Sequence, residues 1–97
     1  MLLFTHPSML EHEPPRGHAE RPERLEAVLE GIAHLPLKRR EAPFAPREAI
    51  TRVHPARYVE ALEAAFAEAR ETRVQLDPDT YLSAGSRQAA YRAAGAC

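Results

Sequence analysis

Cysteine and long hydrophobic runs are scarce in this 97-residue sequence. The single cysteine, Cys97, excludes an internal disulfide framework, which suits a reducing compartment, and we expect a cytoplasmic protein. No apolar run approaches the roughly 20 residues that a membrane span needs. The apolar patch MLLF at residues 1–4 is shorter than the about 7–15 residues of a secretory signal core. We therefore expect neither a membrane span nor a signal peptide.

An excess of charge of either sign is also missing. Lysine and arginine total 13 and aspartate and glutamate total 14, so the formal net charge is −1. This balance gives no electrostatic case for binding nucleic acid or an anionic membrane, and we expect neither as a partner. The length allows one small domain with a modest hydrophobic core.

Helical periodicity is the strongest structural signal in the chain. We expect a short apolar strand over 1–5 and a proline-rich loop over 6–21. The helices that follow are expected at about 22–34, 47–53, 55–70 and 84–97. The third helix has the clearest apolar side, made by Tyr58, Val59, Leu62, Ala65, Phe66 and Ala69, with Glu63 on its outward face. Ser83 or Ser86 is a candidate cap for the last helix. This mixture predicts the α/β fold class.

Three shorter stretches are harder to assign. The basic run at residues 38–40 is expected to be a solvated segment, and residues 42–45 to form a second short strand. Residues 72–76 fit either a third strand or an extended connection. The composition of residues 77–80, DPDT, predicts a turn.

Several residue types capable of chemistry occur, each with an ordinary structural interpretation. His6, His12 and His18 are spaced by six, but this spacing in a proline-rich loop fixes no convergence of metal ligands, so polar loop histidines are favoured. The paired carboxylates Asp77 and Asp79 could serve acid–base or calcium chemistry, and ordinary turn chemistry is favoured. Cys97 is better explained as a small packed residue than as a nucleophile.

Two arginines stand where the helix dipole disfavours them. Arg21 and Arg24 flank the start of the helix expected at 22–34, and a cation there is unfavourable by a few tenths of a kcal/mol or more. Either the glutamates of the same stretch compensate, or one arginine points inward to hold an anion or a backbone carbonyl. The residues alone form no complete catalytic constellation.

Four segments in order nevertheless resemble histone deacetylase-like enzymes, the group that includes bacterial acetylpolyamine amidohydrolases and acetoin-utilisation proteins. GHAERPERL at 17–25 resembles the family's G-H-P-E-R-P-E-R-L, with Ala19 in place of a proline. The other three matching stretches are RVHPARYV at 52–59, DPDTYLS at 77–83 and AAYRAAGA at 89–96; FTHP at 4–7 also fits the first strand and loop. The resemblance covers essentially the whole chain.

The resemblance implies an arginase/deacetylase-type parallel sheet flanked by helices, incomplete in this chain. It implies zinc-dependent hydrolysis of an acetyl-amide, on acetyl-lysine or an acetylpolyamine, with a histidine pair as acid and base and a tyrosine at the oxyanion. Residue by residue, Asp79 matches the rim aspartate that accepts hydrogen bonds from substrate backbone amides. Arg24 matches the arginine of the inner cavity through which acetate leaves.

The resemblance also leaves the family's catalytic residues unmatched. None of the five histidines, His6, His12, His18, His34 and His54, corresponds to the family's zinc ligands or histidine pair. We expect that this chain alone binds no zinc and is inactive, as an N-terminal segment whose partner is the remainder of the deacetylase domain, in missing sequence or a separate chain, or another copy of itself. The alternative is a non-catalytic interaction module derived from a deacetylase.

Overall fold

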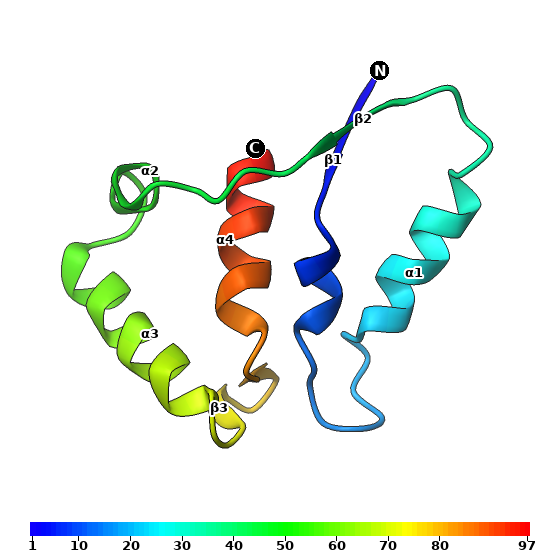
Figure 1. Ribbon diagram of the computed structural model, residues 1–97. Coiled ribbons are helices and arrows are strands. Elements are labelled where there is room, and N and C mark those ends of the chain that lie inside the picture. The colour runs from blue at the N-terminus through cyan, green and yellow to red at the C-terminus, as the bar shows by residue number, and fades with distance from the viewer.

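Nine short elements succeed one another along the chain, which the computed structural model describes over residues 1–97. They are β1 (Leu2–Thr5), η1 (Pro7–Glu11), α1 (Pro22–Gly31), β2 (Lys38–Glu41), α2 (Arg47–Thr51), α3 (Ala56–Ala69), β3 (Val74–Asp77), β4 (Thr80–Leu82) and α4 (Ser86–Ala96). Helix α4 lies between α3 on one side and β1 with η1 on the other, and α1 lies beyond η1 (Figure 1). None of the helices is long and apolar enough to cross a membrane.

Strands β1 and β2 form a parallel pair, joined by a crossover that contains η1 and α1 (Figure 1). Their register aligns Leu2 with Lys38 and Thr5 with Glu41. The second strand thus occupies the basic run, and the prediction of a strand over 42–45 is wrong. The pairing uses only backbone groups, so β2 can leave all four of its side chains exposed while Ala42 beyond it is buried.

The segment expected as an extended loop over 6–21 contains a 3₁₀ helix. Pro7 occupies the first turn of η1, and the His6 ring nitrogen Nδ1 accepts a hydrogen bond from the Ser8 amide at 3.1 Å. A single turn of this kind has no apolar period that sequence reading detects. The loop proper therefore begins after Glu11.

Strands β3 and β4 form an antiparallel hairpin whose connection carries the DPDT turn. Val74 pairs with Leu82 and Gln75 with Tyr81, and the register becomes irregular between Gln75 and Asp77. The stretch that the sequence left open between strand and connection is thus a strand. The hairpin contacts α3 and lies below α4 in Figure 1.

The small core gathers side chains from α3, β4, α4 and the segment after β2. Its buried members are Ala45, Phe66, Ala69, Leu82 and Tyr91. The rings of Phe44 and Tyr91 stack with centroids 4.6 Å apart and planes 7° from parallel. Gly95 allows the chain to pass close over α4, because a Cβ at this position would overlap the carbonyl oxygen of Pro43.

Helix α1 behaves differently from α3. It begins at Pro22, ends at Gly31 and has no buried residue, although its sequence carries the apolar spacing of a core-facing helix. Val28 on that apolar side is 57% exposed. Leu25, Leu29 and Ile32 on the same side are half-buried, so the apolar side of α1 is open at Val28 and only partly covered elsewhere.

Candidate functional site

The loop of the GHAERPERL segment meets the tip of the β3–β4 hairpin. Gly17 adopts a φ of 87°, a left-handed conformation that favours glycine, and His18 follows it directly. His18 Nε2 lies 2.9 Å from the backbone carbonyl oxygen of Asp79, and its Nδ1 lies 3.1 Å from the Glu20 amide nitrogen. The Glu20 carbonyl oxygen also lies 3.2 Å from Nδ1, so both backbone groups of Glu20 contact this nitrogen. Nε2 faces only the Asp79 carbonyl oxygen and must carry a proton to donate to it.

The ring of His18 also contacts an aromatic side chain of the hairpin. The Tyr81 ring meets it edge-on, with centroids 5.7 Å apart and planes at 83°. Gln75 Nε2 donates to the Tyr81 hydroxyl at 3.2 Å across the two strands. One imidazole thus joins the loop to both the tip and the body of the hairpin.

The two aspartates of the turn have different surroundings. Asp77 Oδ1 accepts the Asp79 amide at 2.9 Å, and this backbone hydrogen bond, with one from the Thr80 side chain, lowers the pKa of Asp77 below its ordinary value of 3.8. Asp77 therefore performs turn chemistry, as the sequence favoured. The Asp79 carboxylate is exposed and makes no hydrogen bond or ion pair within the chain. It is available to accept hydrogen bonds from a ligand.

Arg24 lies on the first turns of α1. Its Nη1 pairs with Glu20 Oε2 at 3.1 Å, and the arginine side chain is 62% exposed. Within this chain the arginine is compensated by a glutamate of the same segment, the first of the two interpretations of these charges. Any enclosure of Arg24 would have to come from residues outside the chain.

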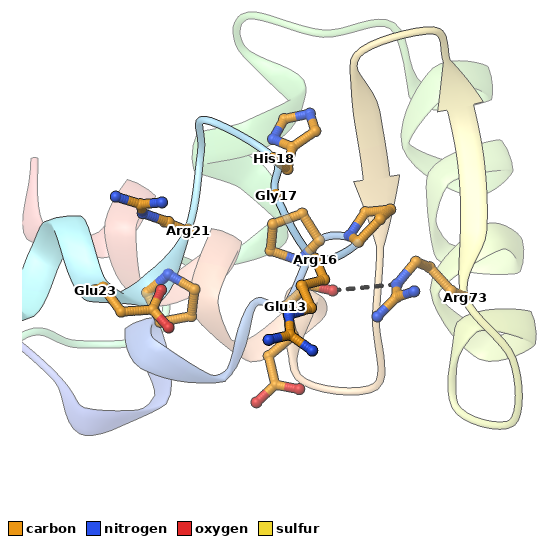
Figure 2. A pocket seen from close by; sticks show the side chains of 10 residues that line it. Glu13, Arg16, Gly17, His18, Arg21, Glu23 and Arg73 are labelled. Atoms are coloured by element: carbon orange, nitrogen blue, oxygen red, sulfur yellow. Dashed lines mark hydrogen bonds between the residues drawn. The ribbon is translucent and has the colours of Figure 1, made fainter.

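An open cavity of about 640 Å³ borders the same loop. Its charged lining residues are Glu13, Arg16, Arg21, Glu23 and Arg73. Figure 2 shows Arg21 and Arg73 on opposite sides of the loop, and Arg73 Nε donates to the Glu13 carbonyl at 3.4 Å. These side chains are exposed and of both signs, which is typical of a solvated surface.

A second polar cluster fixes the start of this loop to α4. The Ser86 hydroxyl, which is buried, lies 2.6 Å from His12 Nδ1 and accepts the Ser83 amide at 2.7 Å. The Ser83 hydroxyl accepts the Glu13 amide at 2.8 Å and donates to the Glu11 carbonyl at 3.3 Å. Neither serine caps α4, whose preceding residue is Gly85, so the expected cap is wrong. The hydroxyls instead bind the loop.

Burial lowers the pKa of His12 below 6.5, and the negative charge of Glu20 only partly opposes this shift. In the neutral ring, Nδ1 can accept a hydrogen bond from the Ser86 hydroxyl. The cluster therefore holds an uncharged histidine at physiological pH.

Sequence reasoning missed a network between α3 and α4. The prediction that Glu63 faces solvent is wrong. Arg87 Nε donates a hydrogen bond to Glu63 Oε2 at 2.9 Å, and the Tyr91 hydroxyl donates one to Glu63 Oε1 at 2.6 Å. Partial burial alone would raise the pKa of Glu63, but the hydrogen bonds from Tyr91 and Arg87 outweigh it and lower the pKa below 4.5. Arg87 also lies 5.2 Å above the Phe44 ring. No pattern within α3 reveals a partner 24 residues away on α4.

The residues of this chain do not fit the zinc ion that the resemblance implies. No group of three histidine, cysteine, aspartate or glutamate side chains converges anywhere in the chain. The three loop histidines have separate contacts: His6 approaches Glu41 at 3.4 Å, His12 contacts Ser86, and His18 contacts Asp79. Cys97 is exposed, so the prediction that it is a packed residue is wrong, and it is far along the chain from all of them. Each of the three histidines thus contacts a different residue of the chain.

Together these features define an α/β protein in which a glycine-containing loop and a hairpin tip form a polar rim. A model of the histone deacetylase domain matches residues 18–97. The chain belongs to the histone deacetylase domain family. A search of curated proteins finds no match.

Solved structures agree with the fold. The crystal structure titled HDA15 HD domain superposes with a TM-score of 0.87 at 24% sequence identity. The match covers 100% of this chain and 30% of that chain, so this chain spans less than a third of that structure. An α/β segment of the deacetylase fold is thereby confirmed.

Proposed function

We propose that this chain is the N-terminal segment of a cytoplasmic, zinc-dependent deacetylase of bacterial type that hydrolyses acetyl-amides, acetyl-lysine or an acetylpolyamine. The segment contributes part of the substrate rim. The observation that carries the proposal is Asp79, whose backbone is engaged on both sides while its exposed carboxylate has no partner. A carboxylate in this state accepts hydrogen bonds from the amides that flank an acetylated side chain.

Arg24 has the second role in this proposal. In the assembled domain, other residues cover α1 and enclose the arginine, whose guanidinium then binds the acetate product through two parallel hydrogen bonds. The exposed ion pair between Arg24 and Glu20 would then be replaced by an ion pair between Arg24 and the product carboxylate. The metal is held by residues outside this chain, since the side chains here do not fit it. Alone, the chain binds no zinc and is inactive.

The surface that would receive the rest of the domain is an apolar groove between η1, α1 and α4. Its volume is about 480 Å³, and its apolar lining is Met9, Leu25, Leu62, Phe66, Leu82, Ala89, Ala90 and Ala93. The chain spans 30% of the matched deacetylase structure, which leaves ample sequence to fill the groove. We assign the groove to the remainder of the deacetylase domain. The alternative is a non-catalytic module that binds another protein through the same apolar groove.

The test of the rim uses Asp79→Asn in the assembled, zinc-loaded domain, with Glu71→Gln as the control because Glu71 is an exposed carboxylate outside the rim. We expect Asp79→Asn to raise KM for an acetyl-lysine peptide by about tenfold or more, since a hydrogen bond to a charged group is worth about 1.5–3 kcal/mol. Zinc content and the Glu71→Gln kinetics should stay unchanged. An unchanged KM in Asp79→Asn would remove Asp79 from the substrate rim.

A further inference from the structure

The tip of the β3–β4 hairpin depends on one side chain of another element. Residues 75–80 are all exposed, and the strand register is irregular beside the turn. His18 donates the single side-chain hydrogen bond that reaches residues 77–80 from outside the hairpin. Leu82 and Val74 anchor the body of the hairpin in the core, but no residue from 75 to 80 is buried, and an isolated two-stranded hairpin is marginally stable in water.

His18 is itself held in one orientation. Its Nδ1 lies 3.1 Å from the amide nitrogen and 3.2 Å from the carbonyl oxygen of Glu20, and its Nε2 donates to the Asp79 carbonyl. The edge contact with Tyr81 fixes the plane of the ring. Gly17, at a φ of 87°, supplies the backbone turn that brings the imidazole to the hairpin.

These contacts restrict the backbone of Asp79. Its amide is bound to Asp77 and its carbonyl to His18, so the backbone is fixed at both ends and only the carboxylate is uncommitted. An acceptor held in this way binds a ligand amide without first losing its own conformational freedom. The charged or titratable residues near the imidazole are Glu20 on its own loop, His12 at the start of that loop and Asp79 on the hairpin.

We propose that His18 is a positioning residue that holds the Asp79 carboxylate in place for an acetyl-amide substrate by clamping the hairpin tip to the GHAERPERL loop. This inference rests on the proposed role of Asp79 in substrate binding. His18 does not touch substrate, and its effect is transmitted through the backbone of Asp79. The recognised group is the amide N–H next to an acetylated side chain.

The first experiment uses the 97-residue chain and three substitutions of His18. Glutamine places an N–H donor near the position of Nε2, asparagine reaches only the position of Nδ1, and phenylalanine keeps a ring without any hydrogen bond. Amide hydrogen exchange by NMR reports the hairpin amides, with α3 amides as the internal check of folding. We expect exchange of the amides of residues 77, 79 and 80 to rise at least fivefold in His18→Asn and His18→Phe and less than twofold in His18→Gln; residue 78 is a proline without an amide hydrogen.

The tautomer provides a second readout on the same chain. The nitrogen chemical shifts of the wild-type imidazole should show the proton on Nε2 at pH 7.5. A ring without a proton on Nε2, or equal exchange at the hairpin tip in all three variants, would overturn the clamp without bearing on the deacetylase assignment.

KM measurements on the assembled domain distinguish an error in the positioning role of His18 from an error in the substrate-binding role of Asp79. We expect His18→Phe to raise KM about tenfold, His18→Gln to restore most of it, and His18→Phe combined with Asp79→Asn to be no worse than Asp79→Asn alone. If Asp79→Asn raises KM but His18→Phe does not, the positioning role is wrong and the rim proposal stands. If the two effects multiply, His18 acts independently of Asp79 and the clamp is again wrong.

Discussion

At the scale of single residues, the chain uses its ionisable side chains mainly to join segments that are far apart in sequence. His12 binds the buried hydroxyl of Ser86 on α4, and Glu63 on α3 binds both Arg87 and Tyr91. Both groups have pKa values below their ordinary ones, for different reasons: burial for His12, and hydrogen bonds that outweigh burial for Glu63. These shifts make stability depend on pH.

His12 gives a prediction for mildly acidic pH. Its folded-state pKa lies below the value of 6.5 expected for the unfolded chain, so below that pH the unfolded state binds more protons and the free energy of unfolding falls. We expect urea denaturation to show lower stability at pH 5.5 than at pH 7.5, by at most about 1.4 kcal/mol per pH unit from this group. His12→Asn should flatten that dependence, whereas substitution of the exposed His34 by Asn should leave it intact. Equal slopes in both variants would contradict the assignment.

Tyr91 gives a second prediction at this scale. Tyr91→Phe removes a 2.6 Å hydrogen bond to Glu63 while the stacked ring remains. We expect a loss of about 1 kcal/mol in the free energy of unfolding. NMR titration should show the pKa of Glu63 rising toward 4.5, because one of the groups that lower it is gone. A pKa that does not move would mean that Arg87 alone controls this carboxyl.

At the scale of elements, the apolar periods predict the helices and miss what depends on pairing between distant segments. The spacing of Val59, Phe66 and Ala69 indicates the buried side of α3, and those three residues are buried. Strand β2 could not be found in the same way, because a KRRE stretch becomes a strand only through its backbone bonds to β1. The same holds for the candidate site. The DPDT turn can be predicted from its own four residues, but the hydrogen bond from His18 to Asp79 joins residues 61 positions apart and cannot.

Gly95 provides a prediction about how elements pack. A Cβ there would meet the Pro43 carbonyl, which is backbone and cannot rotate away, whereas a Cβ at Gly31 meets nothing within 4 Å. We expect Gly95→Ala to cost about 1–3 kcal/mol of stability as overpacking does. Gly31→Ala, at the end of α1, should be neutral or stabilising by up to about 1 kcal/mol. Thermal unfolding of the two variants measures the difference, and equal melting temperatures would contradict the close packing of α4 against this segment.

At the scale of the whole molecule, the chain exposes more surface than its mass requires. Its accessible surface is 6933 Å², against roughly 5,500 Å² for a compact monomer of 10.8 kDa. Its radius of gyration is 14.4 Å, where about 13 Å is typical of 100 residues, and its shortest dimension is 20 Å. The thin shape and the open side of α1 fit a segment that spans 30% of a deacetylase structure.

The open side of α1 leads to a prediction about association. Val28 is already 57% exposed, so Val28→Glu should change the stability of the chain by less than about 0.5 kcal/mol. We expect it to weaken self-association in sedimentation velocity, because a charge at an apolar contact is costly. Ala67→Glu, on the exposed side of α3, is the matched control and should leave association unchanged. If both variants self-associate equally, α1 does not form the contact between copies of the chain.

Size exclusion with inline mass and zinc detection, followed by assay of each fraction for acetate release from acetyl-lysine and acetylpolyamine substrates, tests the central claim most directly. We predict that material of 10.8 kDa carries no zinc and releases no acetate. Zinc, near one atom per complex, and activity should appear only in a larger species that contains this segment together with the rest of the domain. Zinc and acetate release eluting with the 97-residue chain alone would contradict the account.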